Sequence, residues 1–246
     1  MADDYGLWIV DGTSSTNRGT SASVVITTPS AYDTQLPGKY LVYDVPSLVW
    51  YGLIGMKGSY VNNLVNFEAG VYFNYDGKLY LFQKGNCLTG QNNEGWDTAL
   101  ISNSPMYNTA ITINIDCRCL TQNKVYITAT WANGSASLTP SITNGSSYAQ
   151  GVTFSKEFTL ASNSQFCLNE LWYPPYLLAH HKAYVTNYKM GPVKVYDRND
   201  TLIDTINGGK NYHTLANGPG VNCVLPGNPI VSSSGGTDTV TFDLRI

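Results

Sequence analysis

The cysteines and histidines of this sequence are the residues whose types could bind a metal ion. Cys117 and Cys119 flank Arg118, and a zinc site would need further thiols or a histidine beside them. Zinc ribbons pair their cysteines with two residues between them, and the sequence contains no such pair. His180 and His181 are adjacent, so in an extended chain their side chains point to opposite sides. We therefore expect no metal and no cofactor, and we expect both thiols to extend the apolar face of a strand.

Carboxylates offer a second chemistry, because a glycosidase needs only two carboxyl groups across an aromatic-lined cleft. Glu68 and Glu170 have aromatic neighbours, but the E-x-D-x-x-E strand of sandwich glucanases is absent. There is no G-x-S-x-G elbow, and no serine or cysteine lies in the context of a catalytic triad. The sequence therefore predicts no catalytic residue and no enzyme, with glycoside hydrolysis as the most serious rival.

Aromatic side chains are the third group that could recognise a ligand. The chain has 18 tyrosines and five tryptophans, which could stack on sugar rings or fill an interface with another protein. We favour burial of Val45–Tyr51 against another subunit. The aromatic patch predicted from the sequence comprises Trp50, Tyr51, Trp172, Tyr173 and Tyr176.

Composition excludes several other partners. Charged residues make up 13% of the chain, and the 14 lysines and arginines leave a formal net charge of −3, so we expect no binding to nucleic acid. No apolar run approaches the roughly 20 residues that cross a bilayer, which predicts no membrane insertion. The acidic start differs from a secretory signal, and the five cysteines are an odd number, so we expect synthesis in a cytoplasm and reduced thiols.

We expect these side chains to be positioned by β-strands, because an alternation of apolar and polar residues, which is typical of strands, recurs along the chain. It is clearest in Ile111–Cys119, and residues 239–246 repeat it. Apolar stripes at helical spacing are missing, which predicts little helix. Further strands are predicted at Gly6–Val10, Ser23–Thr27, Tyr40–Tyr43, Val125–Trp131 and Val152–Leu160. The fold class is therefore all-β, with antiparallel β-sandwiches of the jelly-roll or Ig-like kind and long loops rich in Asn, Ser and Gly.

Turn residues predict two hairpins and one domain boundary. Val71–Tyr75 and Lys78–Phe82 flank Asp76-Gly77, which predicts a two-residue primed turn. A second hairpin, which begins at Val193, closes through the polar residues 197–200. The Pro174-Pro175 step interrupts any ladder, so we place a boundary between domains 1–170 and 171–246, with a single domain as the alternative.

The amino-terminal segment Asp4-Tyr5-Gly6-Leu7-Trp8-Ile9-Val10-Asp11-Gly12 resembles the opening of a family of small structural proteins encoded among bacteriophage tail genes. Those proteins begin with an acidic lead, then Tyr-Gly-Leu and an alternating strand. The strand is apolar on both faces, so it must be covered on both sides or pair with another chain. We expect an assembly interface formed by Tyr5, Leu7, Trp8, Ile9 and Val10.

The resemblance implies a structural component of a bacteriophage virion, associated with the tail tip or a tail fibre. Its partners would be other virion proteins and further copies of this chain, and its location would be the virion, after synthesis in the cytoplasm of the bacterial host. The alternative is a lectin-like β-sandwich that binds a glycan for attachment to the host surface.

Overall fold

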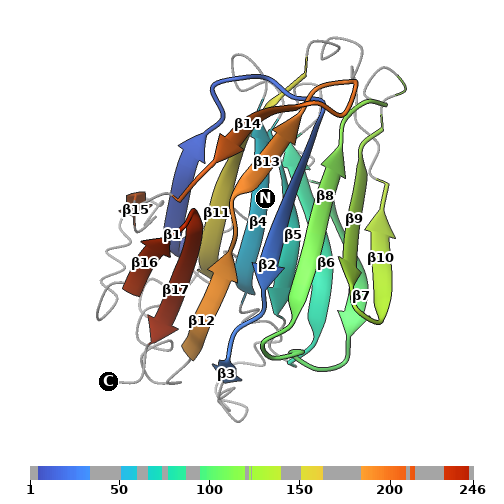
Figure 1. Ribbon diagram of the computed structural model, residues 1–246. Helices are drawn as coiled ribbons and strands as arrows, with labels where there is room; N and C mark the ends of the chain where they lie inside the picture. Colours follow the sequence, from blue (N-terminus) through green and yellow to red (C-terminus); the bar gives the residue numbers. More distant parts are fainter. Residues whose placement is uncertain are drawn as a thin grey trace.

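The computed structural model of the chain describes residues 5–33, 51–59, 66–73, 77–86, 95–119, 122, 124–139, 151–162, 184–208, 211–213 and 230–243. Within these residues the regular structure is β-strand, and every strand pairing is antiparallel. The predicted all-β sandwich is confirmed, since Figure 1 shows two sheets packed face to face. In the described residues no helix is long and apolar enough to cross a membrane.

One sheet has seven strands and forms the rear layer in Figure 1. Its strands, in spatial order, are β15 (Asn211–His213), β1 (Tyr5–Ser14), β11 (Thr153–Ser162), β4 (Tyr51–Ser59), β5 (Asn66–Phe73), β6 (Leu79–Asn86) and β7 (Gly95–Ser102).

The other sheet has ten strands and forms the front layer. Its main path is β10 (Gly134–Leu138), β9 (Tyr126–Trp131), β8 (Ala110–Asp116), β2 (Ser21–Thr27), β12 (Tyr184–Met190), β17 (Thr237–Asp243) and β16 (Ile230–Ser234). Three shorter strands complete it, namely β3 (Ala31–Asp33) beside β12, β13 (Val193–Tyr196) beside β2, and β14 (Leu202–Ile206) beside β13.

β12 and β13 follow one another along the same side of β2. Gly191 links them, and its N–H donates to the carbonyl of Val25 at 2.8 Å, which keeps the ladder continuous between the two strands. The chain thereby brings residues near position 196 beside residues near position 21. This pairing assembles the candidate site described below.

The core lies between the two sheets and consists of alternate residues of their strands. On β8, Ile111, Ile113 and Ile115 are fully buried, and on β5 Val71 and Phe73 face them as part of the same cluster. The alternation that predicted a half-buried strand therefore has its physical basis in a single shared core.

The predicted hairpin around Asp76-Gly77 exists, but its two-residue turn is wrong. Phe73 pairs with Leu79, so five residues separate the strands, and Gly77 has a φ of +75°. A two-residue turn would shift the register by one residue. The observed register keeps Phe73 and Leu79 together in the core and puts Tyr72 opposite Tyr80 on the outer face, which explains its preference.

The strand predicted to run to Cys119 ends three residues earlier. β8 stops at Asp116, and Arg118 and Cys119 form a turn whose Cys119 carbonyl accepts hydrogen bonds from two backbone N–H groups, at 2.8 and 3.2 Å. Cys117 is still buried in the core at 3% exposure, whereas Cys119 is only half-buried. The apolar face thus includes one of the two predicted thiols.

Strands from both predicted domains mix in both sheets. β12, from residues 171–246, pairs with β2, and β15 pairs with β1. The predicted boundary at residue 171 and the strand predicted at Tyr40–Tyr43 lie outside the described residues.

Candidate functional site

A row of four side chains crosses the outer face of the ten-stranded sheet near one end. The strand registers pair Tyr126 with Asp116, Asp116 with Ser21, and Ser21 with Tyr196. Because directly paired residues share a face, all four belong to one line across β9, β8, β2 and β13, which we call the tyrosine row. Three strand spacings of about 4.8 Å put the two tyrosines roughly 14 Å apart.

The tyrosine row is open to solvent. Tyr126 is 39% exposed, and Tyr196 and Ser21 are half-buried. The outward orientation follows from the alternation of side chains along a strand. Asp116, Tyr126 and Tyr196 are adjacent in sequence to Ile115, Ile127 and Val195, which are buried in the core. The core residues therefore orient the tyrosine row outward.

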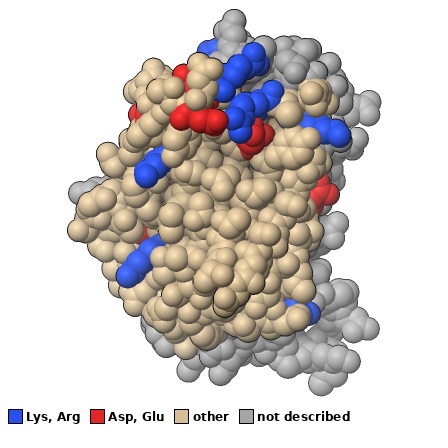
Figure 2. Space-filling view, turned by 45° about the vertical axis from the view of Figure 1, so that its right-hand side comes forward, with Lys and Arg blue, Asp and Glu red and all other residues tan. Residues whose placement is uncertain are grey.

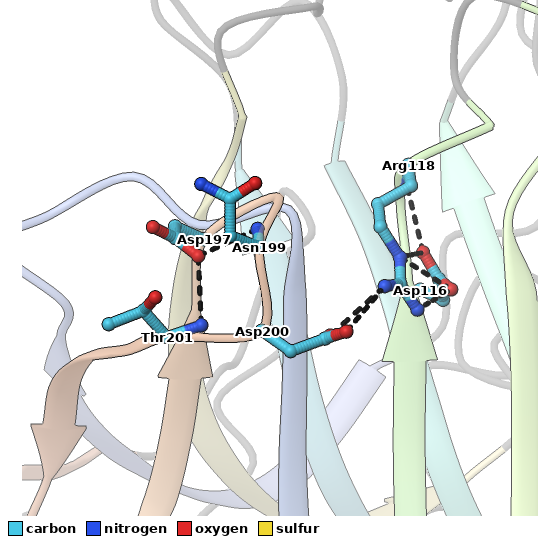
Figure 3. Close-up of polar contacts among 6 residues, drawn as sticks. All are labelled: Asp116, Arg118, Asp197, Asn199, Asp200 and Thr201. Carbon is cyan, nitrogen blue, oxygen red and sulfur yellow. Dashed lines mark hydrogen bonds and ion pairs between the residues drawn. The ribbon is translucent and has the colours of Figure 1, made fainter.

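Arg118 fixes the carboxylate at the centre of the tyrosine row. Its backbone N–H donates to Asp116 Oδ1 at 2.9 Å, and its guanidinium reaches both carboxylate oxygens, with Nη2 2.6 Å from Oδ2. The same guanidinium donates through Nη1 to both oxygens of Asp200, at 3.0 and 3.1 Å. Figure 3 shows Arg118 between these two carboxylates.

The loop that carries Asp200 is held by its own hydrogen bonds. Asp197 accepts from the backbone N–H groups of Asn199 at 2.8 Å and Thr201 at 2.9 Å, as Figure 3 shows. Asp200 adopts a φ of +59°, a left-handed conformation that aspartate tolerates. This turn between β13 and β14 therefore presents Asp200 to Arg118 in a defined position.

The pKa values of Asp116, Arg118 and Asp197 are all shifted in the direction that favours the charged form of the side chain. Partial burial opposes ionisation of Asp116, but hydrogen bonds and the charge of Arg118 outweigh it and lower the pKa of that carboxyl. The side-chain hydrogen bond and the charge of Asp116 raise the pKa of Arg118. The backbone N–H of Thr201 is the main cause that lowers the pKa of Asp197.

Beyond the tyrosine row the outer face carries hydroxyl and amide groups. The adjacent row across β10, β9, β8 and β2 consists of Ser137, Thr128, Asn114 and Ser23, and it ends at Lys194 of β13. Figure 2 shows a face that is mainly uncharged, with most of its charged side chains gathered towards the upper end. The sheet therefore offers a broad neutral surface, with the charged residues Arg118, Asp116 and Asp200 at its border.

Metal ligands do not gather in the part of the chain that the structure describes. No group of three or more His, Cys, Asp or Glu residues there could hold a metal ion. Arg118 occupies the space between Asp116 and Asp200, so this carboxylate pair is matched to a guanidinium rather than to a cation from solution.

Among the described residues, none of the site residues predicted from the sequence belongs to the tyrosine row. Tyr5, Leu7, Trp8, Ile9 and Val10 belong to β1, which pairs with β11 on one side and, from Ile9 to Asp11, with β15 on the other. Glu68 lies in β5 and Tyr51 begins β4. The remaining predicted positions, which lie outside the described residues, are Trp50, Glu170, Trp172, Tyr173, Tyr176, His180 and His181.

Sequence reasoning missed the tyrosine row for a clear reason. Alternation alone predicts that Tyr126 and Asp116 face outward, as polar neighbours of buried isoleucines. The partners Ser21 and Tyr196 come from distant parts of the chain, and only the order of the strands brings them together.

Comparison with known proteins gives structural similarity only. No protein-family model matches the chain, and no curated protein matches it. A scytalido-glutamic peptidase with a peptide-based transition-state analogue is 12% identical, with coverage of 97% of this chain and 98% of that one and a TM-score of 0.43. A family 16 glycoside hydrolase, an endo-glucanase from Bacteroides ovatus, is 13% identical, with coverage of 62% and 58% and a TM-score of 0.36.

These similarities contradict one expectation from the sequence. The absence of recognisable catalytic motifs led us to expect that the protein is not an enzyme, yet the similar structures include peptidases of the eqolisin family and glycoside hydrolases. That expectation is therefore withdrawn, and TM-scores below 0.5 assign no reaction to this chain.

Proposed function

We propose that this protein binds carbohydrate on the outer face of the ten-stranded sheet, with the tyrosine row as the central contact. The observation that carries the proposal is that two accessible tyrosines, Tyr126 and Tyr196, lie at the two ends of one line across the sheet. A carboxylate and a hydroxyl lie between them on that line. This proposal develops the lectin-like reading of the sequence, in which the glycan serves attachment to a host surface.

The chemistry of the tyrosine row suits a sugar. Pyranose rings present CH groups that pack on aromatic faces, and their hydroxyls need both donors and acceptors. Asp116 supplies an acceptor, Arg118 supplies donors, and Ser21 supplies both. Because Arg118 already holds Asp116 in place, little side-chain entropy would be lost when a ligand binds.

The surroundings favour a neutral glycan over a charged ligand. In the row beside the tyrosine row, Ser137, Thr128, Asn114 and Ser23 are uncharged, and only Lys194 at its end carries a charge. The charge of Arg118 is matched by Asp116 and Asp200. A phosphate or sulfate group would meet two carboxylates beside its guanidinium. A neutral oligosaccharide that lies across the strands would meet an aromatic ring at each end.

The test is a glycan-array screen followed by calorimetric titration of the best neutral ligand. Tyr126→Ala and Tyr196→Ala are each expected to weaken binding by roughly tenfold, about 1.4 kcal/mol, because each removes one stacking platform. The matched control is Tyr107→Ala, since Tyr107 is 45% exposed and precedes β8 at the opposite end of that strand. Equal losses in all three variants, or no neutral glycan bound by the folded protein, would overturn the proposal.

A further inference from the structure

A lysine and an aspartate meet in the interior, between the two sheets. Lys156 on β11 and Asp238 on β17 have side chains that are only 1% and 2% exposed, and Lys156 Nζ lies 3.1 Å from Asp238 Oδ2. Lys156 also donates to the carbonyl of Gly236 at 2.9 Å. The amine and the carboxyl group are therefore in contact, away from solvent.

Neighbouring groups clamp the carboxyl group. The hydroxyl of Ser233 donates a hydrogen bond to Asp238 Oδ1, the oxygen that Lys156 does not contact. Gly208 packs so closely that a Cβ at this position would lie 2.4 Å from the same oxygen. Each carboxyl oxygen of Asp238 therefore has a defined neighbour, and the group has little room to rotate.

Burial raises the free energy of the ionised form of this pair. Two charges removed from water lose their hydration, and their mutual attraction offsets that loss only in part. Desolvation is the main cause that lowers the pKa of Lys156, and it outweighs the opposing charge and hydrogen bond of Asp238. Transfer of one proton from the ammonium to the carboxylate leaves a neutral amine in contact with a neutral carboxylic acid.

We propose that Lys156 and Asp238 condense to an intramolecular amide bond that joins the two sheets through the core. The Lys156 nitrogen attacks Cγ of Asp238, an N–C bond forms and one C–O bond of the carboxyl group breaks. The departing oxygen leaves as water with two protons from the ammonium–carboxylate pair. The balance requires no oxidant, activated donor or cofactor.

The surroundings supply what the reaction requires. Reactants held in orientation reach effective concentrations of about 10⁵–10⁸ M, which compensates for the poor leaving group. The Ser233 hydroxyl is hydrogen-bonded to the oxygen that gains negative charge as the nitrogen attacks, so it stabilises the tetrahedral intermediate. The Gly236 carbonyl accepts one N–H of Lys156 and thereby orients the amine.

The experiment is intact mass spectrometry of the denatured full-length protein. The wild type is expected to be lighter than its sequence mass by one water molecule. In a tryptic digest, residues 125–182 should remain joined to residues 211–245, with no cleavage after Lys156. Lys156→Arg keeps a cation but removes the amine nucleophile, and it should have the full sequence mass. Asp238→Asn should lose one ammonia instead of one water.

Several results would overturn the bond. A folded wild type at its full sequence mass, with the two peptides separate, excludes it. A water loss that persists in Lys156→Arg would place the dehydration elsewhere, for example in a succinimide at Asp76-Gly77. If Lys156→Arg does not fold, the joined peptide of the wild type decides the matter by itself.

Discussion

Arg118 links two parts of the chain through its two aspartates, and this gives the tyrosine row a defined dependence on pH. The pKa of Asp116 lies below its ordinary value of 3.8 in the folded protein. A carboxyl group with a lowered folded pKa stabilises the fold above its unfolded pKa, and this contribution is lost as the pH falls through the folded pKa. The pH window for Asp116 is therefore the acid side, below about pH 4.

We predict that Arg118→Gln raises the pKa of Asp116, because the variant removes the guanidinium hydrogen bonds and the charge that lower it and keeps only the hydrogen bond from the backbone N–H of residue 118. Carboxyl carbon NMR titration measures the shift directly. Urea unfolding at pH 7 and at pH 3 should then show a smaller loss of stability on acidification than in the wild type. Arg198→Gln, a neighbouring exposed arginine, is the control and should leave the titration of Asp116 unchanged. An unchanged Asp116 titration in Arg118→Gln would contradict the assignment.

At the scale of strands, β1 is the element for which the sequence and the structure suggest different roles. Its two apolar faces and its resemblance to phage tail proteins predict an assembly interface, which stays a prediction. In the structure β1 pairs with β11 from Tyr5 to Ser14, which makes it a structural part of the seven-stranded sheet. A role in folding and a role in assembly lead to different outcomes when the strand is removed.

We predict that deletion of residues 1–11 lowers the melting temperature and the soluble yield, because β11 loses one of its two partner strands along most of its length and keeps only β4. Circular dichroism with thermal melting measures this effect. A truncated chain that melts like the full-length protein but fails to form oligomers would instead support the assembly role. Size-exclusion chromatography of both proteins at matched concentration distinguishes the two results.

Most strands could be predicted from the sequence, whereas their neighbours in the sheets could not. Alternation located β2, β8, β9 and β17 to within a few residues, since one face of each strand is buried. The register of the β5–β6 hairpin was wrong by one residue, because core packing rather than the Asp-Gly step decides it. The tyrosine row and the Lys156–Asp238 contact both depend on strands far apart in sequence, for which local patterns carry no signal.

At the scale of the whole molecule, the two sheets share their strands between the segments 1–170 and 171–246. β2 pairs with β8 on one side and with β12 and β13 on the other, so the ten-stranded sheet is built from strands of both segments. The core cluster likewise contains residues from both segments, such as Ile113 and Val240. Each segment would leave a broken sheet behind if the other were lost.

We predict that the protein unfolds in one cooperative transition rather than in two. Differential scanning calorimetry should give a calorimetric enthalpy equal to the van't Hoff enthalpy, since strands of both segments share one core. Lys156→Arg, measured in parallel, should shift the midpoint without splitting the transition. Two separate transitions would instead support the division into two domains near residue 171.

The central position of β2 also has a consequence for synthesis on the ribosome. Ser21 pairs with Asp116, and Ile26 pairs with Met190, so β2 is translated long before either of its neighbours exists. Loop closure over such distances is slow, because the chain loses conformational entropy before the stabilising contacts between the strands have formed. The nascent chain can pair β2 with β8 once residue 116 has been made, but the other edge of β2 stays unpaired until the last third of the chain has been made. Folding is thus expected to be largely post-translational, and expression at lower temperature or with a chaperone that shields strands should raise the yield of native protein.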